Sequence, residues 1–245
     1  MNLANKTIKE IALEMPAATR VFQELKIDYC CGGGKNFLEA CEKAELSSEM
    51  VEKKISDALQ ESAGRSSNDF LQQVSASKLI DLIVQKHHIF TKNELARLTP
   101  LMEKVAGKHG EHYPYLIELK RLFIDLRDEL LPHMQKEEFI LFPHVKRLEA
   151  SEIANISVPR PAFGTVTNPI RMMSVEHDSA GDILREIRRT TSNFTPPADA
   201  CPSFKALYFG LEELEKDLHQ HIHLENNVLF PMSLELENKS AVALA

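Results

Sequence analysis

The sequence predicts an all-α protein, and three observations support that fold class. Apolar residues recur with the period of a helix along nearly the whole chain of 245 residues. No run alternates β-branched and polar residues, and nine glycines leave little room for the turns of a sheet. Helix start signals precede several apolar runs, and the segment from Thr7 to Glu10 has the pattern of a capping box. The architecture then depends on where the helices break.

The amino-terminal part predicts a small helical domain over residues 1–62. After the helix that starts at Thr7, a second short helix contains Pro16 in its first turn. Asn36 is placed to cap a third helix, and Ser47 or Ser48 a fourth. All four are short, so their apolar faces must pack against one another.

Longer helices follow a polar segment. Residues 63–75 are mostly small and polar, which is typical of a linker. Beyond it, residues 76–245 predict a second domain with the helix number and helix lengths of a four-helix bundle. The four helices are expected at about 76–98, 114–147, 168–191 and 203–236. The segment 99–113 is expected to cross from the first helix to the second.

Composition excludes several classes of partner. The chain has 36 acidic and 29 basic residues, a formal charge of −7, which repels a phosphate backbone unless a basic patch overrides it. No such patch is visible, so no nucleic acid is expected. No apolar stretch approaches the roughly 20 residues of a membrane helix, and the amino terminus lacks a signal-peptide core. A cytoplasmic location without membrane contact is therefore predicted.

An internal repeat is the most informative feature of the predicted bundle. The segments from His133 to Pro143 and from His221 to Pro231 both read H-x3-E-x3-L-F-P. The similarity extends upstream, because a histidine precedes each copy by about the same number of residues. Two helical hairpins of one design are therefore expected to face each other.

The spacing inside each copy predicts a metal site in the core. Residues four apart lie on the same helix face, so His133 stands beside Glu137 and His221 beside Glu225. Each pair falls on an apolar stripe and therefore points inward. A buried carboxylate without a partner costs several kcal/mol, so a cation is expected. Imidazole and carboxylate suit iron, manganese or zinc, and inward carboxylates on paired hairpins favour a dinuclear iron centre.

Periodicity assigns some of the remaining histidines. His177 falls on an apolar stripe of the third helix and is expected to face the core. On the first helix, His87 and His88 lie on different apolar stripes, and the pattern does not choose between them.

Other histidines are expected outside the core. His109 and His112 fall in the expected crossing segment, where no face can be assigned. His219 and His223 are predicted to point to solvent, and His144 to be a surface or capping residue.

The motifs together resemble those of the RIC family. They are Tyr29-Cys30-Cys31-Gly32-Gly33, Glu176-His177-Asp178 and the segment from His221 to Pro231. RIC proteins are di-iron proteins of iron-centre repair, with a hemerythrin-like carboxy-terminal domain. The resemblance covers nearly the whole chain. It implies a hemerythrin-like bundle that acts in the repair of iron-sulfur clusters damaged by oxidative or nitrosative stress.

The resemblance also implies a ligand set. By the family pattern the metal ligands are His88, His109, His133, Glu137, His177, His221 and Glu225. These would hold two iron ions with an oxo or hydroxo bridge, and if both glutamates bridge, one coordination position stays open. One departure from the family pattern is Pro132, directly before His133, which is expected to disturb the helix there and to shift the ligand slightly.

The vicinal thiols Cys30 and Cys31 allow two interpretations. They can be small apolar residues of a minor core, or soft ligands and redox groups that act in iron transfer. The resemblance favours a functional amino-terminal module. Cys41 and Cys201 are expected to be structural.

Three functions remain open at this point. The first is cluster repair by supply of iron, with damaged or apo iron-sulfur proteins as partners. The second is a di-iron nitric oxide reductase or peroxidase that acts at the open position. The third is a hemerythrin-type oxygen carrier or sensor. The residues leave the number of subunits open, with a homodimer as one alternative.

Overall fold

The described part of the chain is helical. The computed structural model describes residues 3–29, 33–62, 74–154, 156 and 158–242. Within these ranges the ordered elements are helices, and the one extended pairing is an isolated bridge between Thr7 and Asn36. The predicted all-α fold is confirmed. The predicted linker falls mostly in residues 63–73, which lie outside the described residues.

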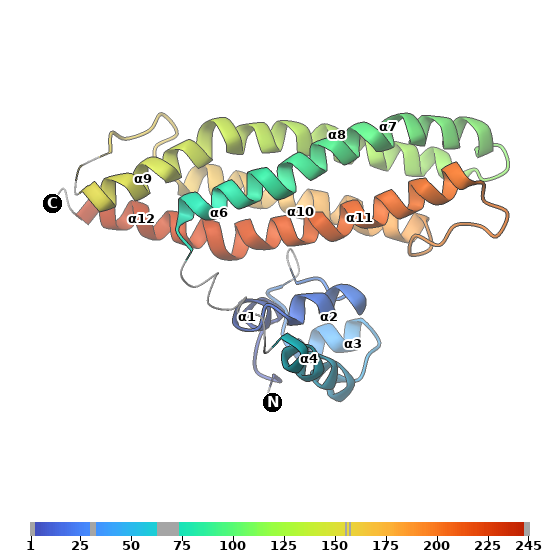
Figure 1. The fold of residues 1–245 in the computed structure, drawn as a ribbon, viewed down its shortest axis with the longest axis horizontal. Coiled ribbons are helices and arrows are strands. Elements are labelled where there is room, and N and C mark those ends of the chain that lie inside the picture. The colour runs from blue at the N-terminus through green and yellow to red at the C-terminus, as the bar shows by residue number, and fades with distance from the viewer. Residues whose placement is uncertain (1–2, 30–32, 63–73, 155, 157, 243–245) are drawn as a thin grey trace. The chain divides into compact units, whose positions relative to one another are not determined.

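Four short helices form the amino-terminal part (Figure 1). They are α1 (Ile8–Glu14), α2 (Ala18–Glu24), α3 (Phe37–Lys43) and α4 (Ser48–Ser62). The predicted capping box is present, because the Thr7 hydroxyl accepts from the Glu10 amide at 3.2 Å and the Glu10 carboxylate accepts from the Thr7 amide at 2.8 Å. Pro16 lies just before α2 rather than inside its first turn.

Two further predicted caps hold this group of helices in place. The Asn36 side chain accepts a hydrogen bond from the Leu38 amide at 2.9 Å and so starts α3. The Ser47 hydroxyl accepts from the Met50 amide at 3.4 Å. The helices then bury a core of their own, which includes Ile8, Ile11, Phe22, Phe37, Val51 and Ile55.

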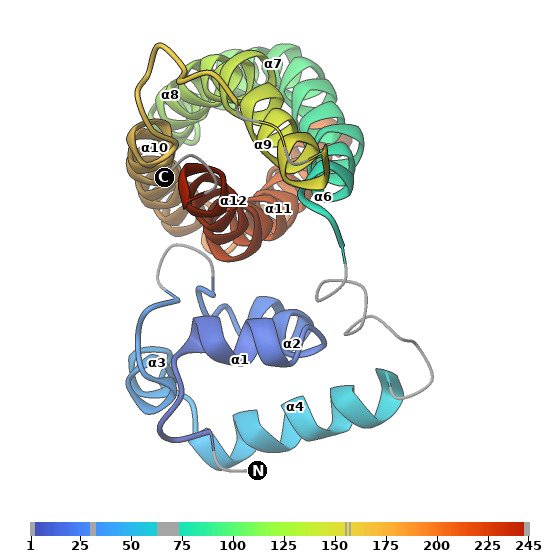
Figure 2. The same ribbon diagram turned by 90° about the vertical axis from the view of Figure 1, so that its left-hand side faces the viewer.

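Four long helical rods follow, and Figures 1 and 2 show them side by side around a common axis. The first rod is α6 (Ala76–Leu82), η1 (Ile83–His88) and α7 (Ile89–His109), and the second is α8 (Tyr115–Lys136), η2 (Glu137–Leu141) and α9 (Phe142–Ala154). The third is α10 (Thr167–Thr190), and the fourth is α11 (Pro202–Leu224), η3 (Glu225–Leu229) and α12 (Phe230–Val242). The η segments are π-helical.

The chain divides into two compact units at Ser75 and Ala76. One unit holds residues 1–75 with the segment Ile222–Pro231, and the other holds Ala76–His221 with the residues from Met232 onward. Because Ile222–Pro231 is continuous with α11 and α12, this segment is part of the fourth rod.

The first rod is longer than predicted, and the predicted crossing segment 99–113 is wrong. The helix continues through Pro100 as far as His109, and the connection to α8 is a short turn. Leu98, Met102 and Val105 are all buried, so the apolar stripe carries the helix past the proline. That burial outweighs the one backbone hydrogen bond that Pro100 cannot make. Pro132 is likewise accommodated inside α8.

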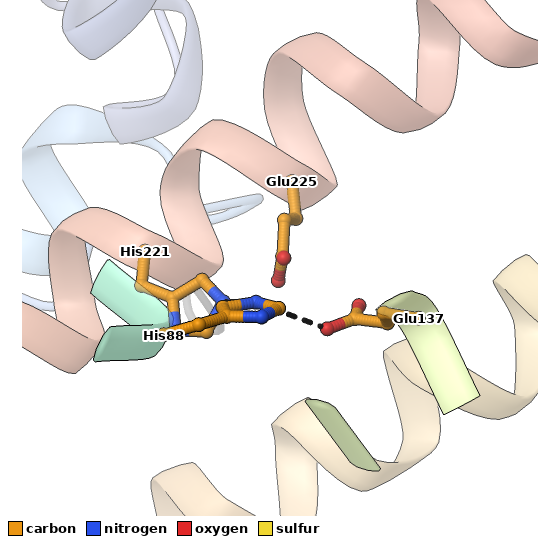
Figure 3. Close-up of side chains that lie close together, drawn as sticks. All are labelled: His88, Glu137, His221 and Glu225. Carbon is orange, nitrogen blue, oxygen red and sulfur yellow. Dashed lines mark hydrogen bonds and ion pairs between the residues drawn. The ribbon is translucent and has the colours of Figure 1, made fainter. Parts of the chain in front are cut away.

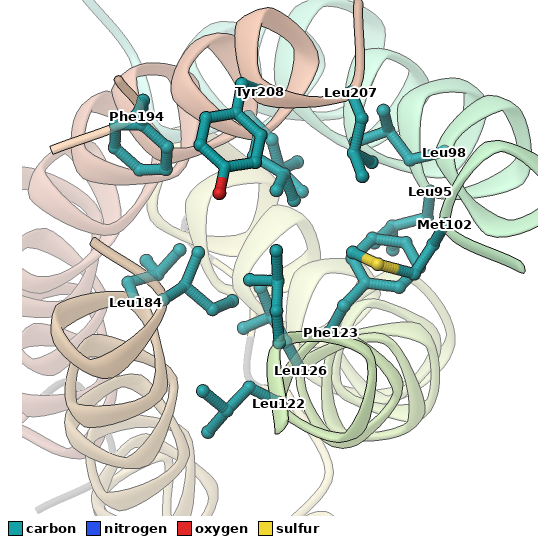
Figure 4. Packing of buried hydrophobic residues seen from close by; sticks show 14 of the residues in the cluster. Leu95, Leu98, Met102, Leu122, Phe123, Leu126, Leu184, Phe194, Leu207 and Tyr208 are labelled. Atoms are coloured by element: carbon teal, nitrogen blue, oxygen red, sulfur yellow. The ribbon is translucent and has the colours of Figure 1, made fainter. Parts of the chain in front are cut away.

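An apolar section fills the part of the bundle that is formed by α7, α8, α10 and α11. Figure 4 shows side chains from all four rods pointing into this space. Its buried members include Leu95, Leu98, Met102, Phe123, Leu126, Leu184, Leu207, Tyr208 and Leu211. Full burial of each such leucine contributes about 1.5–3 kcal/mol to stability. The apolar section therefore holds the four rods in a fixed register.

The bundle helices are amphipathic rather than uniformly apolar. Among the described residues, we find no helix that combines the length and the hydropathy needed to cross a membrane.

Candidate metal centre

Six buried side chains converge inside the bundle and form two overlapping groups. One group is His88, Glu137, His221 and Glu225, and the other is His133, Glu137, His177 and Glu225. Within each group, the candidate ligand atoms all lie within 4.8 Å of one another. Both carboxylates belong to both groups, and each group has two histidines of its own. We call these six residues the ligand cluster.

The ring nitrogens within each group are spaced like ligands of one ion. The Nε2 atoms of His88 and His221 are 3.1 Å apart, and those of His133 and His177 are 3.0 Å apart. Two ligands that each lie about 2.1 Å from an ion at a right angle are themselves about 3 Å apart. Figure 3 shows the carboxylates of Glu137 and Glu225 directed toward the first pair of rings.

Glu137 stands between the two groups. Its Oε2 atom is 3.5 Å from Nε2 of His88 and 3.4 Å from Nε2 of His133. Glu137 and Glu225 are both 0% exposed. Two ionised carboxylates at this depth require positive charge nearby, which metal ions would supply. The donor set of imidazole and carboxylate oxygen fits iron binding.

Three of the four rods become π-helical where they carry ligands. The segment η1 ends at His88, η2 begins at Glu137 and η3 begins at Glu225. A π-turn inserts one extra residue, which rotates the side chains that follow, and such turns often occur at functional sites. The π-turns were not predicted from the sequence, because hydrophobic periodicity presupposes a regular helix. The available signal was the proline near the start of α9 and of α12, Pro143 and Pro231, which cannot donate the next helical hydrogen bond.

Two ligand histidines are bonded to carboxylates outside the ligand cluster. Nδ1 of His88 donates to Oε1 of Glu138 at 2.7 Å, and Nζ of Lys92 donates to the same oxygen at 2.7 Å. Burial alone would raise the pKa of the Glu138 carboxyl, but Lys92 and His88 outweigh that effect and hold the pKa below its ordinary value. Neither Glu138 nor Lys92 was predicted from the sequence.

The same arrangement occurs on the other group. Nδ1 of His133 donates to Oε2 of Glu176 at 2.8 Å, and Lys136 forms an ion pair with Glu176. Burial raises the pKa of Glu176, and Lys136 and His133 again bring it below the ordinary value. Each group of the ligand cluster thus has one histidine with an outer carboxylate.

Comparison with known proteins decides the family. The family model of the hemerythrin HHE cation binding domain matches residues 79–233, and that of a domain of unknown function (DUF542) matches residues 4–59. A probable iron-sulfur cluster repair protein of Haemophilus influenzae is 37% identical over 234 residues, which are 96% of this chain and 99% of that protein. The chain belongs to the iron-sulfur cluster repair family.

Further members of the repair family are similar over the same length. The iron-sulfur cluster repair protein YtfE is 36% identical to this chain in Yersinia pseudotuberculosis and in Yersinia pestis. In both cases the match covers 237 residues, 97% of this chain and 100% of the relative.

The structure resolves the ambiguous pair of histidines in this member of the repair family. His88 lies in the ligand cluster, as the family pattern implies. His87 is also buried, but its Nδ1 contacts Oδ1 of Asp217 at 2.9 Å and its ring stacks on that of His221 with centroids 5.9 Å apart. His87 is therefore a neighbour of the cluster rather than a member.

His109 does not reach the ligand cluster, contrary to the prediction. It ends the helix that begins just after His88, and 21 residues at about 1.5 Å each separate the two by about 31 Å. Its Nε2 atom instead lies 3.4 Å from Sγ of Cys201, and its ring contacts Phe204. The family resemblance alone suggested His109 as a ligand, since no helix face could be assigned in the predicted crossing segment, and the structure places it at the far end of the helix that starts after His88.

Two other histidine predictions are wrong. His144 is buried, with its ring edge-on to Phe163. His223 is buried too, and Asn227 donates from Nδ2 to its Nδ1 at 2.8 Å. Burial lowers the pKa of His223 to about 4. Burial lowers the pKa of both rings and so favours their neutral form.

The cysteines divide into two pairs. Cys30 and Cys31 lie outside the described residues. Cys41 is buried in the core of the amino-terminal helices, and that burial raises the pKa of its thiol. Cys201 is partly buried beside His109.

Proposed function

We propose that this protein takes part in the repair of damaged iron-sulfur clusters and that it supplies iron from the ligand cluster. The observation that carries the proposal is the combination of a near full-length match to named repair proteins with six converging ligands. The clients would be damaged or apo iron-sulfur proteins. The donor site would hold iron with histidine and carboxylate, whereas the clusters of the clients are held mainly by thiolates.

The ligand cluster supports a pair of irons rather than one. Each group has two histidines, and the two groups share Glu137 and Glu225, which are placed to bridge. Without His109, two six-coordinate ions with an oxo or hydroxo bridge would keep two open positions instead of the single one expected from the sequence. One would fall on each ion.

A transfer experiment tests the donor role. The chain is loaded with iron-57 and mixed with a hydratase whose cluster has lost one iron, in the presence of a chelator that traps free iron. We expect iron-57 in the restored cluster and faster recovery than with the same amount of ferrous salt. Recovery without iron-57 in the client would contradict the supply of iron by this protein.

The two open positions keep small-molecule chemistry as the second candidate. Nitric oxide, oxygen or peroxide could bind at either position. Steady turnover with a chemical reductant would favour a nitric oxide reductase or peroxidase, and reversible oxygenation would favour a hemerythrin-type carrier or sensor. Either result without iron transfer would replace the donor role.

The thiols Cys30 and Cys31 are proposed to assist iron release. None of the six residues of the ligand cluster precedes His88, so replacing both cysteines with alanine should leave iron binding unchanged. The double variant and the wild type, loaded equally with iron, should differ in the rate of cluster restoration. Equal rates would return both cysteines to a packing role.

Three further assignments complete the proposal. We propose a cytoplasmic location, because four cysteines, two of them adjacent, lack the number and spacing of a secreted disulfide framework. The domains are residues 1–62 and 76–245 with the linker 63–75 between them. A homodimer is retained as one alternative, to be decided by sedimentation.

A further inference from the structure

In each group of the ligand cluster, one histidine contacts a carboxylate on its outer side, and that carboxylate in turn contacts a lysine. Behind His88 stand Glu138 and Lys92, which belong to the second and first rods. Lys92 bonds the same Glu138 oxygen that accepts from His88, and both distances are 2.7 Å. The carboxylate is therefore fixed from both sides.

The arrangement behind His133 has the same chemistry and a different origin in the chain. Glu176 comes from the third rod and accepts from Nδ1 of His133 at 2.8 Å through Oε2, while Lys136 pairs with Oε1. Here one oxygen receives the histidine and the other receives the lysine. Each group therefore has an outer carboxylate, and the two carboxylates come from different rods.

The contacts determine which ring nitrogen carries hydrogen. A carboxylate oxygen accepts, so Nδ1 of His88 and Nδ1 of His133 must donate. In a neutral ring, Nε2 is then a bare acceptor that faces the ligand cluster. The Nε2 to Nε2 distances of 3.1 and 3.0 Å agree with this assignment, because His221 and His177 can each donate a hydrogen bond to the bare nitrogen in the metal-free chain.

We propose that Glu138 and Glu176 are positioning residues, each of which holds one histidine in the tautomer and orientation that bind one of the two ions. This inference rests on the proposed di-iron site. A carboxylate behind a ligand histidine also makes the ring a stronger donor to the metal. Lys92 and Lys136 bind the two carboxylates and hold them in place.

Substitution of the outer carboxylates tests the proposal through metal affinity. Glu138→Leu and Glu176→Leu should each weaken one iron site about 10–100-fold in a ferrous titration against a competing chelator, and leave the other site intact. Glu138→Gln should restore most of the affinity, because its amide oxygen still accepts from Nδ1. The matched control is Glu103→Leu, which removes another ion pair between the first two rods, with Lys120 at 2.5 Å, far from any ligand.

Nitrogen NMR of the metal-free chain gives a second readout that does not depend on iron. Histidine selectively labelled with nitrogen-15 should show hydrogen on Nδ1 for His88 and His133, and Glu138→Leu should change the pattern of His88 alone. A hydrogen on Nε2 of both rings in the wild type would overturn the proposal.

The affinity experiment separates this inference from the function it rests on. Two irons in the wild type, with Glu138→Leu and Glu176→Leu equal to Glu103→Leu, would overturn the positioning role and leave the di-iron site standing. Equal loss in Glu138→Leu and Glu138→Gln would also overturn it, since the amide preserves the hydrogen bond. A wild type that binds no iron would contradict both proposals.

Discussion

The apolar section and the ligand cluster lie in the same four rods and differ in almost every physical respect. In the apolar section the helices are regular and bury leucine, phenylalanine and methionine. Around the ligand cluster, three of the four rods are π-helical and bury carboxylates and histidines. The first region contributes stability by burial, and the second gives up some of that stability to hold a reactive site.

Because of this difference, replacing a buried side chain should have opposite effects on the stability of the two regions. Apolar burial stabilises by about 25 cal/mol per Å² removed from water. A buried carboxylate lowers stability until a cation compensates it. A substitution that removes a polar ligand should therefore affect metal content, and one that shortens an apolar side chain should affect folding.

The largest expected effect is on Glu225, which is shared by both groups. Glu225→Leu should empty or uncouple the pair of irons. In the metal-free chain, the same change should raise the free energy of unfolding by about 1–3 kcal/mol, because an apolar side chain of similar size carries no desolvation penalty in this buried position. Iron analysis and urea denaturation measure the two effects. An intact coupled pair in this variant would remove Glu225 from the ligand set.

Shortening Leu126 should have the opposite effects on stability and on iron content. It is fully buried in the apolar section, so Leu126→Ala should lower the free energy of unfolding by about 2–5 kcal/mol through lost burial and the cavity left behind. Iron content at room temperature should not change. Loss of iron in a folded Leu126→Ala chain would show that the two regions are coupled more tightly than their separation suggests.

Substitution of His109 and of His88 compares the effect of the same residue type on iron content in the two regions. His88→Ala should remove iron from one group, whereas His109→Ala should retain the wild-type iron content because that ring contacts Cys201 and Phe204. Iron per chain after gel filtration measures both. Equal losses in the two variants would reinstate His109 as a ligand.

The smallest expected effect concerns His144 and pH. Burial, together with Arg147, lowers the pKa of His144, and Glu237 opposes them in part. In the unfolded chain the His144 ring binds a proton near pH 6.5, whereas in the folded chain the same ring stays neutral. The free energy of unfolding should therefore fall as pH drops below about 6.5. The slope for one histidine is at most about 1.4 kcal/mol per pH unit.

A variant isolates this contribution from those of the other histidines. His144→Phe should show a smaller loss of stability than the wild type between pH 7 and pH 5 in metal-free denaturation. Identical pH dependence in the two chains would mean that His144 does not remain neutral in the folded state.

The sequence was sufficient for the bundle and for most of the ligand cluster. The repeated spacing of His133 with Glu137, on apolar stripes, already required inward ligands, and the stripe through His177 placed a third rod correctly. It was not sufficient for His109, because periodicity assigned no helix face within the predicted crossing segment 99–113, whereas burial of Met102 and Val105 continues the helix through it.

The roles of the outer carboxylates Glu138 and Glu176 were not predicted, for another reason. The repeat reveals only what both copies share, and the positions equivalent to Glu138 and Glu176 are Asn226 and His87. Neither outer carboxylate has an acidic counterpart in the other copy. The π-turns were missed because hydrophobic periodicity over one turn does not distinguish four residues from five.

The proposal on which the others depend is that the ligand cluster holds two irons that interact. Mössbauer spectroscopy of the wild-type chain, loaded with iron-57 and quantified per chain, tests it directly. We predict two irons per chain whose spins are coupled through a bridge. A single iron with an uncoupled paramagnetic spectrum, or one tightly bound zinc with no second site after ferrous reconstitution, would contradict the account.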